Sequence, residues 1–251
     1  MRFALDQFDG VFDVRNAAGK PYVLIGGQAV NYWAETYLAQ EPELAKWCPF
    51  TSEDIDFHGD QADVSRIAKK LGLPARFPHK IEMTALAGII PFKIGGLQAN
   101  IEIVRLIPGL ARNKIDAWSI SAKRGGQEIR VLDPISLLCG KANLALTIDQ
   151  KQRRDVDHLH ILLLCVRAFL HETLHGVTAG ELPGRGWLGA VERVLKLAES
   201  ATGKKAARKL GMIWRDALPE RQIAFSKHPL VVQFLKKRLP QWCEKQKTCA
   251  R

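Results

Sequence analysis

The chain has 251 residues, 47% of them hydrophobic and 25% charged, an ordinary composition for a soluble globular protein of one large domain or two modest ones. Its net charge of +11 lies in the second part: residues 151–251 carry 20 Lys and Arg against 9 Asp and Glu, whereas residues 1–150 carry 17 of each. A basic region favours a polyanionic partner, because phosphate contacts supply most non-specific nucleic-acid affinity. A solvated helical surface is the alternative explanation.

The sequence also argues against secretion and membrane insertion. The five cysteines are odd in number and lack C-x-x-C spacing, which is typical of reduced thiols in a cytoplasmic protein. Asp6, Asp9 and Asp13 lie where a secretory signal would be apolar. The longest apolar run, residues 159–170, contains charged and imidazole side chains and is shorter than the about 20 residues of a membrane-spanning helix. We therefore expect a cytoplasmic protein with no membrane partner.

The first elements predicted along the chain are a strand, a glycine turn and a helix. Residues Tyr22–Ile25 are apolar and partly β-branched, which predicts a short buried strand ending at Gly26 and Gly27. Residues 28–38 then have helical spacing. The elements expected next are a strand around 54–57, a helix at 62–71, two or three strands within 81–106, and a hairpin of 117–122 with 128–132. Paired glycines at 95–96 and 125–126 mark the two hairpin turns.

The pattern becomes helical from residue 133 to the end. The predicted helices are 134–147, 152–173, 187–200, 204–216 and 229–246. We therefore predict an α/β (α+β) protein, with a mixed-sheet domain at residues 1–132 followed by a basic helical bundle at residues 133–251.

Two acidic residues stand in a D-x-D pattern on the second predicted strand. A strand places residues i and i+2 on one face, about 6.6 Å apart, so Asp54 and Asp56 would point the same way while Ile55 and Phe57 point into the core. Two carboxylates on one face repel each other unless a cation lies between them, and hard oxygen ligands suit Mg²⁺. The D-x-D pair therefore predicts a magnesium site.

A third acid, Glu102, lies in the apolar run Ile101–Val104, which reads as another strand. A lone carboxylate in such a run is either a solvent-facing residue or a metal ligand. Asp116 is the substitute acid if Glu102 faces solvent.

These features together resemble the nucleotidyltransferases of the DNA polymerase β-like superfamily. Residues 25–27, 54–57 and 101–103 match that family's hydrophobic-Gly-Gly, [DE]-h-[DE]-h and h-[DE]-h motifs, although the spacing from Gly27 to Asp54 is longer than usual and suggests an inserted loop. The resemblance implies transfer of a nucleoside monophosphate from a triphosphate, with two Mg²⁺ ions bound by the three acids. Gly26 and Gly27 would approach the phosphates, with hydroxyl contacts from Thr51 and Ser52.

The region after the sheet resembles the AbiEii-type toxin nucleotidyltransferases. The order of Lys141 and then residues 153–159 (R-R-D-V-D-H-L) carries this likeness. The resemblance implies that Lys141 approaches the triphosphate and that Asp155 lies near it or holds a basic group. It also implies RNA, tRNA in particular, as acceptor, and a toxin–antitoxin or defence role with a cognate antitoxin as protein partner. Protein and small-molecule acceptors stay open.

Two other functions are open at this stage. Residues 171–175 spell H-E-x-x-H, which on a helix places His171 and His175 on one face as zinc ligands, with Glu172 as the general base of a metallopeptidase. The motif lies near the end of an apolar helix, and its third ligand is unspecified. The other alternative is a non-catalytic nucleotidyltransferase fold that binds RNA or protein.

Overall fold

The computed structural model describes residues 1–79, 81–151 and 153–249, with residues 247–249 described by their backbone alone. The chain divides into two compact units. Unit 1 consists of Met1–Thr36 with Trp47–Gly140, and unit 2 of Tyr37–Lys46 with Lys141–Arg251. The stretch between the first helix and the D-x-D strand thus contributes a segment to unit 2, in addition to the helices that follow the sheet.

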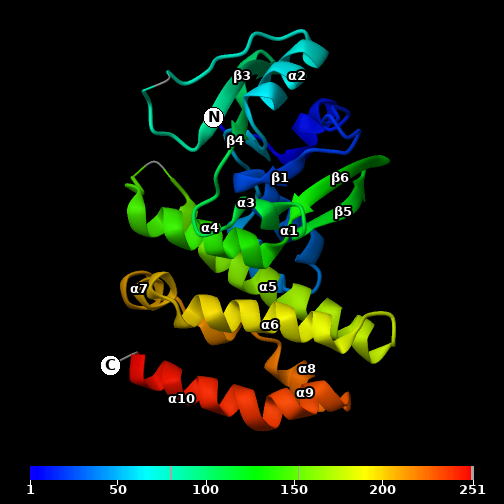
Figure 1. Ribbon diagram of the computed structural model, residues 1–251, viewed down its shortest axis with the longest axis vertical. Coiled ribbons are helices and arrows are strands. Elements are labelled where there is room, and N and C mark those ends of the chain that lie inside the picture. The colour runs from blue at the N-terminus through cyan, green and yellow to red at the C-terminus, as the bar shows by residue number, and fades with distance from the viewer. Residues whose placement is uncertain (80, 152, 250–251) are drawn as a thin grey trace. The chain divides into compact units, whose positions relative to one another are not determined.

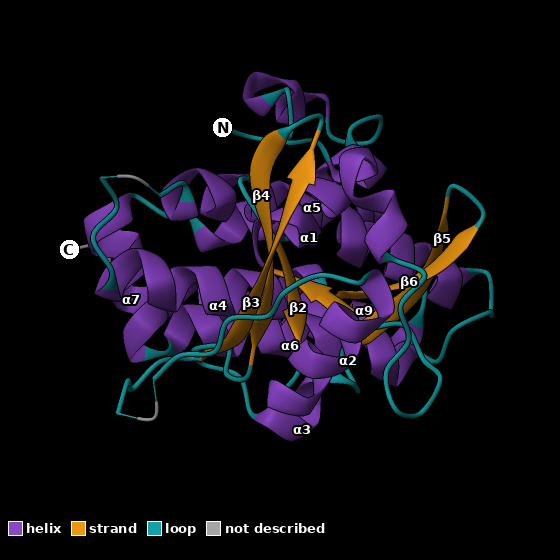
Figure 2. Ribbon diagram, turned by 90° about the horizontal axis from the view of Figure 1, so that it is seen from above, coloured by secondary structure: helices purple, strands orange, loops and turns teal. Residues whose placement is uncertain are grey.

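Unit 1 is built on a mixed six-stranded sheet with the strand order β3-β4-β2-β1-β6-β5 (Figures 1 and 2). The strands are β1 (Val23–Ile25), β2 (Ile55–His58), β3 (Leu86–Ile94), β4 (Leu97–Val104), β5 (Ser119–Arg124) and β6 (Gln127–Leu132). The helices associated with it are α1 (Gly26–Tyr37), α2 (Gln61–Leu71) and α3 (Arg112–Ile115), and a 3-10 helix, η1, covers Leu5–Val11. This mixed sheet followed by helices confirms the predicted α/β fold class.

Local turn chemistry accounts for the two hairpins at the ends of the sheet. Strands β3 and β4 pair antiparallel around Gly95 and Gly96, whose φ angles are 57° and 84°. Strands β5 and β6 pair in the same way around Gly125 and Gly126, with φ angles of 55° and 83°. Consecutive positive φ angles are cheap only for glycine, so these pairs specify tight turns. Both hairpins were predicted from the sequence.

The order of the central strands decides which side chains meet. β1 runs antiparallel to β2 and parallel to β6, while β2 runs parallel to β4. All three residues of β1 are buried, as expected for a short strand inside a sheet. The indole N–H of Trp33 on α1 donates to the Leu132 carbonyl at 2.8 Å, which ties this helix to the end of β6.

Unit 2 is helical. Its elements are α5 (Asp155–Thr178), α6 (Gly184–Glu199), α7 (Ala201–Leu210), α8 (Glu220–Phe225), α9 (Pro229–Gln233) and α10 (Leu239–Cys249), with 3-10 helices η2 (Pro42–Trp47) and η3 (Trp214–Ala217). α4 (Pro134–Thr147) begins in unit 1 and ends in unit 2. α5 is long and apolar enough to span a membrane by length and composition, but 61% of its most apolar stretch is buried, as in core helices of soluble proteins.

Two of the predicted helices are interrupted. The one expected at 204–216 ends at Leu210, because Gly211 adopts a left-handed conformation with φ 66° and closes the helix. The one expected at 229–246 contains a π-helical turn at Phe234–Arg238 between α9 and α10. The indole N–H of Trp187 on α6 donates to the Leu170 carbonyl of α5 at 3.1 Å, and Trp187 is fully buried between these helices.

Candidate active site

The parallel pairing of β2 and β4 places two of the predicted acids side by side. Asp56 is the register partner of Glu102, and the residues flanking each of them are buried. Since strand residues alternate between faces, both carboxylates lie on the half-buried face of the sheet, opposite its core face. Glu102 is therefore placed beside the D-x-D pair, whereas Asp116 lies at the end of α3, is exposed and pairs with Arg130 at 2.8 Å.

The first acid of the D-x-D pair is held by a neutral partner. Asp54 immediately precedes β2, and its Oδ1 accepts a hydrogen bond of 3.0 Å from the side-chain amide of Asn100 on β4. Burial raises the pKa of the Asp54 carboxyl, the bond from Asn100 opposes this, and the negative charge of Glu53 adds to it. A cation at this carboxylate would relieve the penalty that burial imposes on its charged form.

The glycine at the start of α1 is required by the carboxylate of Asp56. Gly26 has a φ of 67°, and a Cβ atom added to it would lie 1.9 Å from Oδ2 of Asp56. A side chain at this position would therefore displace the carboxylate as well as strain the backbone. Gly27 follows in the first turn of α1 and is buried. The glycine pair thus brings the start of a helix against the acidic face.

Thr51 and Ser52 lie in the segment that leads into β2, and both are half-buried. The backbone of Ser52 pairs with Phe3 through two hydrogen bonds of 2.8 and 3.0 Å, so the N-terminal segment is attached just before the D-x-D strand. The contact of the Thr51 and Ser52 hydroxyls with a nucleotide stays a prediction.

Lys141 and Asp155 form a buried ion pair within unit 2. Nζ of Lys141 donates to Oδ1 of Asp155 at 2.7 Å, and the two side chains are 9% and 2% exposed. Arg153 donates to the other carboxylate oxygen at 2.6 Å. Burial by itself would raise the pKa of Asp155, but the two cations outweigh it and lower the pKa to about 2. Asp155 thus holds a basic group, which is one of the two roles expected for it, and a contact of Lys141 with triphosphate stays a prediction.

Two residues on the acidic face were missed from the sequence. Asn100 binds Asp54, and His58 continues the face that carries Asp56, with its Nδ1 3.0 Å from the Val104 carbonyl. Burial lowers the pKa of the His58 imidazole. Strand periodicity could have identified both residues, because Asn100 is two residues from Glu102 and His58 is two residues from Asp56.

The chemistry of this face fits Mg²⁺ bound together with a substrate. Within the described ranges, no group of three His, Cys, Asp or Glu side chains is gathered closely enough to hold a metal by itself. Mg²⁺ in nucleotide-dependent enzymes takes one or two carboxylates together with substrate phosphates, not a cage made wholly of protein. The donors of Asp54, Asp56 and Glu102 are all oxygens, and Gly26 leaves the space that the Asp56 carboxylate occupies. The residues present therefore fit the ion.

The H-E-x-x-H residues lie in a different environment. His171 and His175 line a cavity of about 330 Å³ with Arg221, whose positive charge disfavours a cation there. Glu172 accepts a hydrogen bond of 2.7 Å from the hydroxyl of Tyr37. The side chains that line this cavity, all in the described part of the chain, include no acid or cysteine that could serve as a third ligand. This arrangement does not support a zinc site.

Comparison with known proteins gives a likeness in structure only. No model of a protein family matches the chain, and no curated protein matches it. Among solved structures, the chain is similar to an antigenic nucleotidyltransferase-like protein from Paracoccidioides brasiliensis, with a TM-score of 0.45 and 14% sequence identity over 84% of this chain and 95% of that one.

Proposed function

We propose that the chain is a Mg²⁺-dependent nucleotidyltransferase that moves a nucleoside monophosphate from a nucleoside triphosphate to an acceptor hydroxyl. The observation that carries the proposal is the register of β2 and β4, which aligns Asp56 with Glu102 and lets Asn100 bind Asp54. Three carboxyl groups on neighbouring inner strands would provide ligands for cations, and the start of α1 at Gly26 would provide a helix N-terminus for phosphates.

In the proposed reaction, each of the three carboxylates has a defined role. The acceptor oxygen forms a bond to the α-phosphorus, and the bond from that phosphorus to the β-phosphate oxygen breaks, so pyrophosphate leaves with the electron pair. The Glu102 carboxylate takes the proton of the acceptor hydroxyl. The two Mg²⁺ ions, held by Asp54, Asp56 and Glu102 together with phosphate oxygens, would neutralise the charge of the reacting phosphates.

We further propose RNA, tRNA in particular, as the acceptor, in a cytoplasmic toxin–antitoxin or defence system with a cognate protein partner. The support is the likeness to AbiEii-type enzymes at Lys141 and residues 153–159, together with the 20 basic residues of the segment 151–251. A polyanionic acceptor is the substrate class that such a charge excess favours.

The test is a transfer assay with each of the four α-labelled nucleoside triphosphates, Mg²⁺, and total tRNA or protein as acceptor. Asp54→Asn should lower transfer by about a hundredfold or more, because it removes a ligand of the Mg²⁺ that would neutralise the reacting phosphates. Glu53→Gln is the matched control, since this neighbouring acid is exposed and pairs with Arg2 at the surface.

The results of the transfer assay distinguish the proposed reaction and acceptor from the alternatives. Label on tRNA that depends on Asp54 supports the reaction and the acceptor, and label on protein alone supports the reaction with another acceptor. Equal loss in Glu53→Gln would show that the effect is general electrostatics. Absence of label on both RNA and protein, with the chain folded, would overturn transfer to a macromolecule and favour a small-molecule acceptor or the binding-protein alternative.

A further inference from the structure

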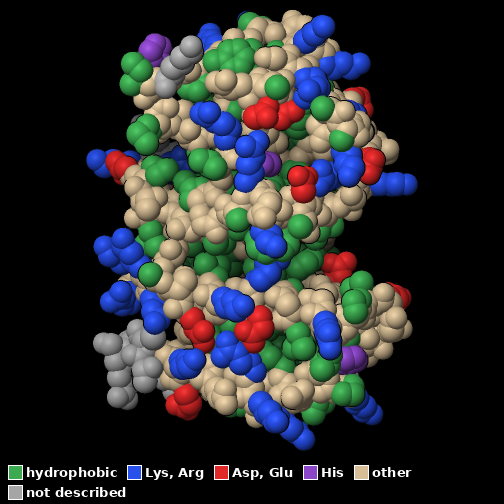
Figure 3. Space-filling view, viewed as in Figure 1, with side chains coloured by type: hydrophobic (Ala, Val, Ile, Leu, Met, Phe, Trp, Pro, Cys, Tyr) green, Lys and Arg blue, Asp and Glu red, His purple; other side chains and the backbone are tan. Residues whose placement is uncertain are grey.

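Helix α7 carries a cluster of four basic side chains. Many basic side chains of unit 2 pair with acids, among them Arg167 with Glu41 and Arg238 with Glu192. The four basic residues of α7 are Lys204, Lys205, Arg208 and Lys209. All four are exposed, and within the ranges the structure describes none of them forms an ion pair. Figure 3 shows Lys and Arg side chains spread over the visible face, some of them next to Asp and Glu.

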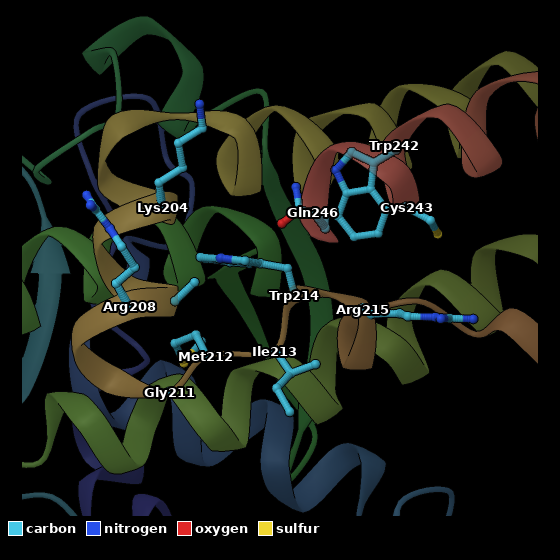
Figure 4. A pocket seen from close by; sticks show the side chains of 11 residues that line it. Lys204, Arg208, Gly211, Met212, Ile213, Trp214, Arg215, Trp242, Cys243 and Gln246 are labelled. Carbon is cyan, nitrogen blue, oxygen red and sulfur yellow. The ribbon is translucent and has the colours of Figure 1, made fainter. Parts of the chain in front are cut away.

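One side of α7 borders a cavity of about 610 Å³, a size typical of small-ligand sites. Lys204 and Arg208 line it, and they lie four residues apart on one helix face, where like charges repel each other (Figure 4). The third cation at the cavity, Arg215, is already neutralised by a two-pronged ion pair with Glu220. No acid lines the cavity among the residues that the structure describes. An anion between Lys204 and Arg208 would remove their repulsion.

Apart from Arg215 and Gln246, the rest of the cavity wall is mostly apolar. Met212, Trp214 and Trp242 are buried side chains of this wall, and Ile213 is 60% exposed beside them. A ligand held by the cation pair would therefore also cover an apolar surface, which a planar heteroaromatic ring does well. The cavity thus combines an anion site with an apolar wall.

A buried hydrogen-bond donor in this wall lacks a partner. The indole N–H of Trp214 donates to the Gly203 carbonyl at 3.0 Å, whereas Nε1 of the fully buried Trp242 has no acceptor in the described structure. An unmet buried donor costs about 1–3 kcal/mol, so a donor of this kind needs an explanation. Figure 4 shows the nitrogen edge of Trp242 facing the side chain of Gln246, which also lines the cavity. Nε1 itself is not accessible in this structure, so an acceptor that enters from the cavity would reach it only when the Gln246 side chain turns aside.

We propose that this cavity binds a nucleotide. Its phosphate lies between Lys204 and Arg208, its base covers the wall of Met212 and Trp214, and an acceptor atom of the base takes the Trp242 N–H. The same chemistry is offered by a free mononucleotide and by one unpaired nucleotide of an RNA strand. The inference concerns binding within unit 2 and does not depend on the proposed transfer reaction.

The experiment is calorimetric titration of the full chain at fixed ionic strength in EDTA, so that Mg²⁺-dependent binding at the acidic face makes no contribution. The ligands are the four nucleoside monophosphates, a single-stranded RNA hexamer, duplex RNA and inorganic phosphate. A monophosphate that binds identifies a free nucleotide as the source of the ligand. Binding of the hexamer alone identifies an unpaired nucleotide of RNA.

Charge-matched variants of one helix give the decisive comparison. Lys204→Gln with Arg208→Gln should weaken binding by about tenfold or more, because two charge-assisted hydrogen bonds are lost. Lys205→Gln with Lys209→Gln removes the same charge from the same helix outside the cavity, and should change binding by less than about twofold. Equal weakening in both double variants would overturn the proposal, since it would mean non-specific attraction of polyanions.

The indole donor is tested by Trp242→Phe, which keeps an aromatic ring and removes only the unmet N–H and part of the ring volume. Binding should weaken by about fivefold with the circular dichroism spectrum unchanged. Unchanged affinity would overturn the donor assignment. Duplex RNA that binds as tightly as the hexamer, inorganic phosphate that binds as tightly as a nucleotide, or absence of all binding would overturn the site itself. Asp54→Asn should bind the nucleotide in this cavity with unchanged affinity while it loses transfer, so a failure of the binding proposal can be distinguished from a failure of the proposed transfer reaction.

Discussion

Replacement of Asp155 by asparagine should destabilise the protein strongly. The substitution keeps the shape of the side chain and removes its charge, which leaves the Lys141 ammonium, only 9% exposed, without its counter-ion at 2.7 Å. Breaking a buried pair by removing one partner costs about 3–5 kcal/mol. The loss of the Arg153 contact adds little to this cost, because the Arg153 side chain is 41% exposed and can be hydrated instead. We expect a loss of about 3–5 kcal/mol in the free energy of unfolding.

Urea unfolding followed by circular dichroism measures this loss. Asp157→Asn is the matched control, because Asp157 opens the same helix and pairs with Arg154 at 3.0 Å, but is 48% exposed and should contribute about 1 kcal/mol or less. A double variant, Lys141→Met with Asp155→Leu, should recover most of the stability, since it leaves no buried charge. A loss below about 1 kcal/mol in Asp155→Asn would refute the reasoning and show that Lys141 reaches water.

The pH dependence of stability follows from the same contact. The folded pKa of Asp155 is about 2, below the ordinary 3.8, so the folded state favours the carboxylate. Its stabilisation is fully present above about pH 4 and is lost as the pH falls through 2. The difference corresponds to about 2 kcal/mol. Wild type should therefore lose this contribution on acidification, and Asp155→Asn should show a correspondingly flatter profile.

Three further outcomes test the site. Gly26→Ala should lower the free energy of unfolding by at least about 1 kcal/mol because of the positive φ, and it should also lower transfer because the new Cβ displaces the Asp56 carboxylate. Gly72→Ala, at a φ of 66° with open space around it, should lower the free energy of unfolding in the same way and leave transfer unchanged. Equal transfer in the two variants would contradict the Gly26 contact. Nucleotide with Mg²⁺, at about a hundredfold over the Kd of the acidic face, should raise the unfolding free energy of wild type by about 2.7 kcal/mol more than the same nucleotide in EDTA, and Asp54→Asn should lack this Mg²⁺-dependent gain in calorimetry. His171→Ala should leave transfer and metal content by emission spectrometry unchanged, and loss of bound zinc with the fold intact would revive the peptidase alternative.

The sheet and its acidic face could be predicted because their signals are local. Alternation in residues 54–57 and 100–103 assigns each side chain to a face whatever the tertiary structure is. The paired glycines similarly fix the turns by backbone chemistry. Neither signal fixes the register between β2 and β4, so the alignment of Asp56 with Glu102 required the structure.

Contacts between segments that are far apart in the chain could not be predicted from the sequence. Tyr37–Lys46 joins unit 2 through contacts such as the bond from Tyr37 to Glu172, and no local pattern encodes that choice. The contact of Gly26 with Asp56 is of the same kind, because a glycine after a strand predicts a turn but not which side chain needs the space. The pairing of Lys141 with Asp155 likewise appears only once α4 and α5 are placed.

The environments of two carboxylates indicate which one is suited to gain a cation. Asp155 already has two, Lys141 and Arg153, and its lowered pKa shows that its charge is compensated. Asp54 is bound by the neutral amide of Asn100, and burial raises its pKa. A cation gains most at a carboxylate whose charge is still penalised by its surroundings, and least at one already neutralised. This difference is the reason that we propose a metal at the sheet face, and that we expect Asp155 to contribute to the stability of unit 2.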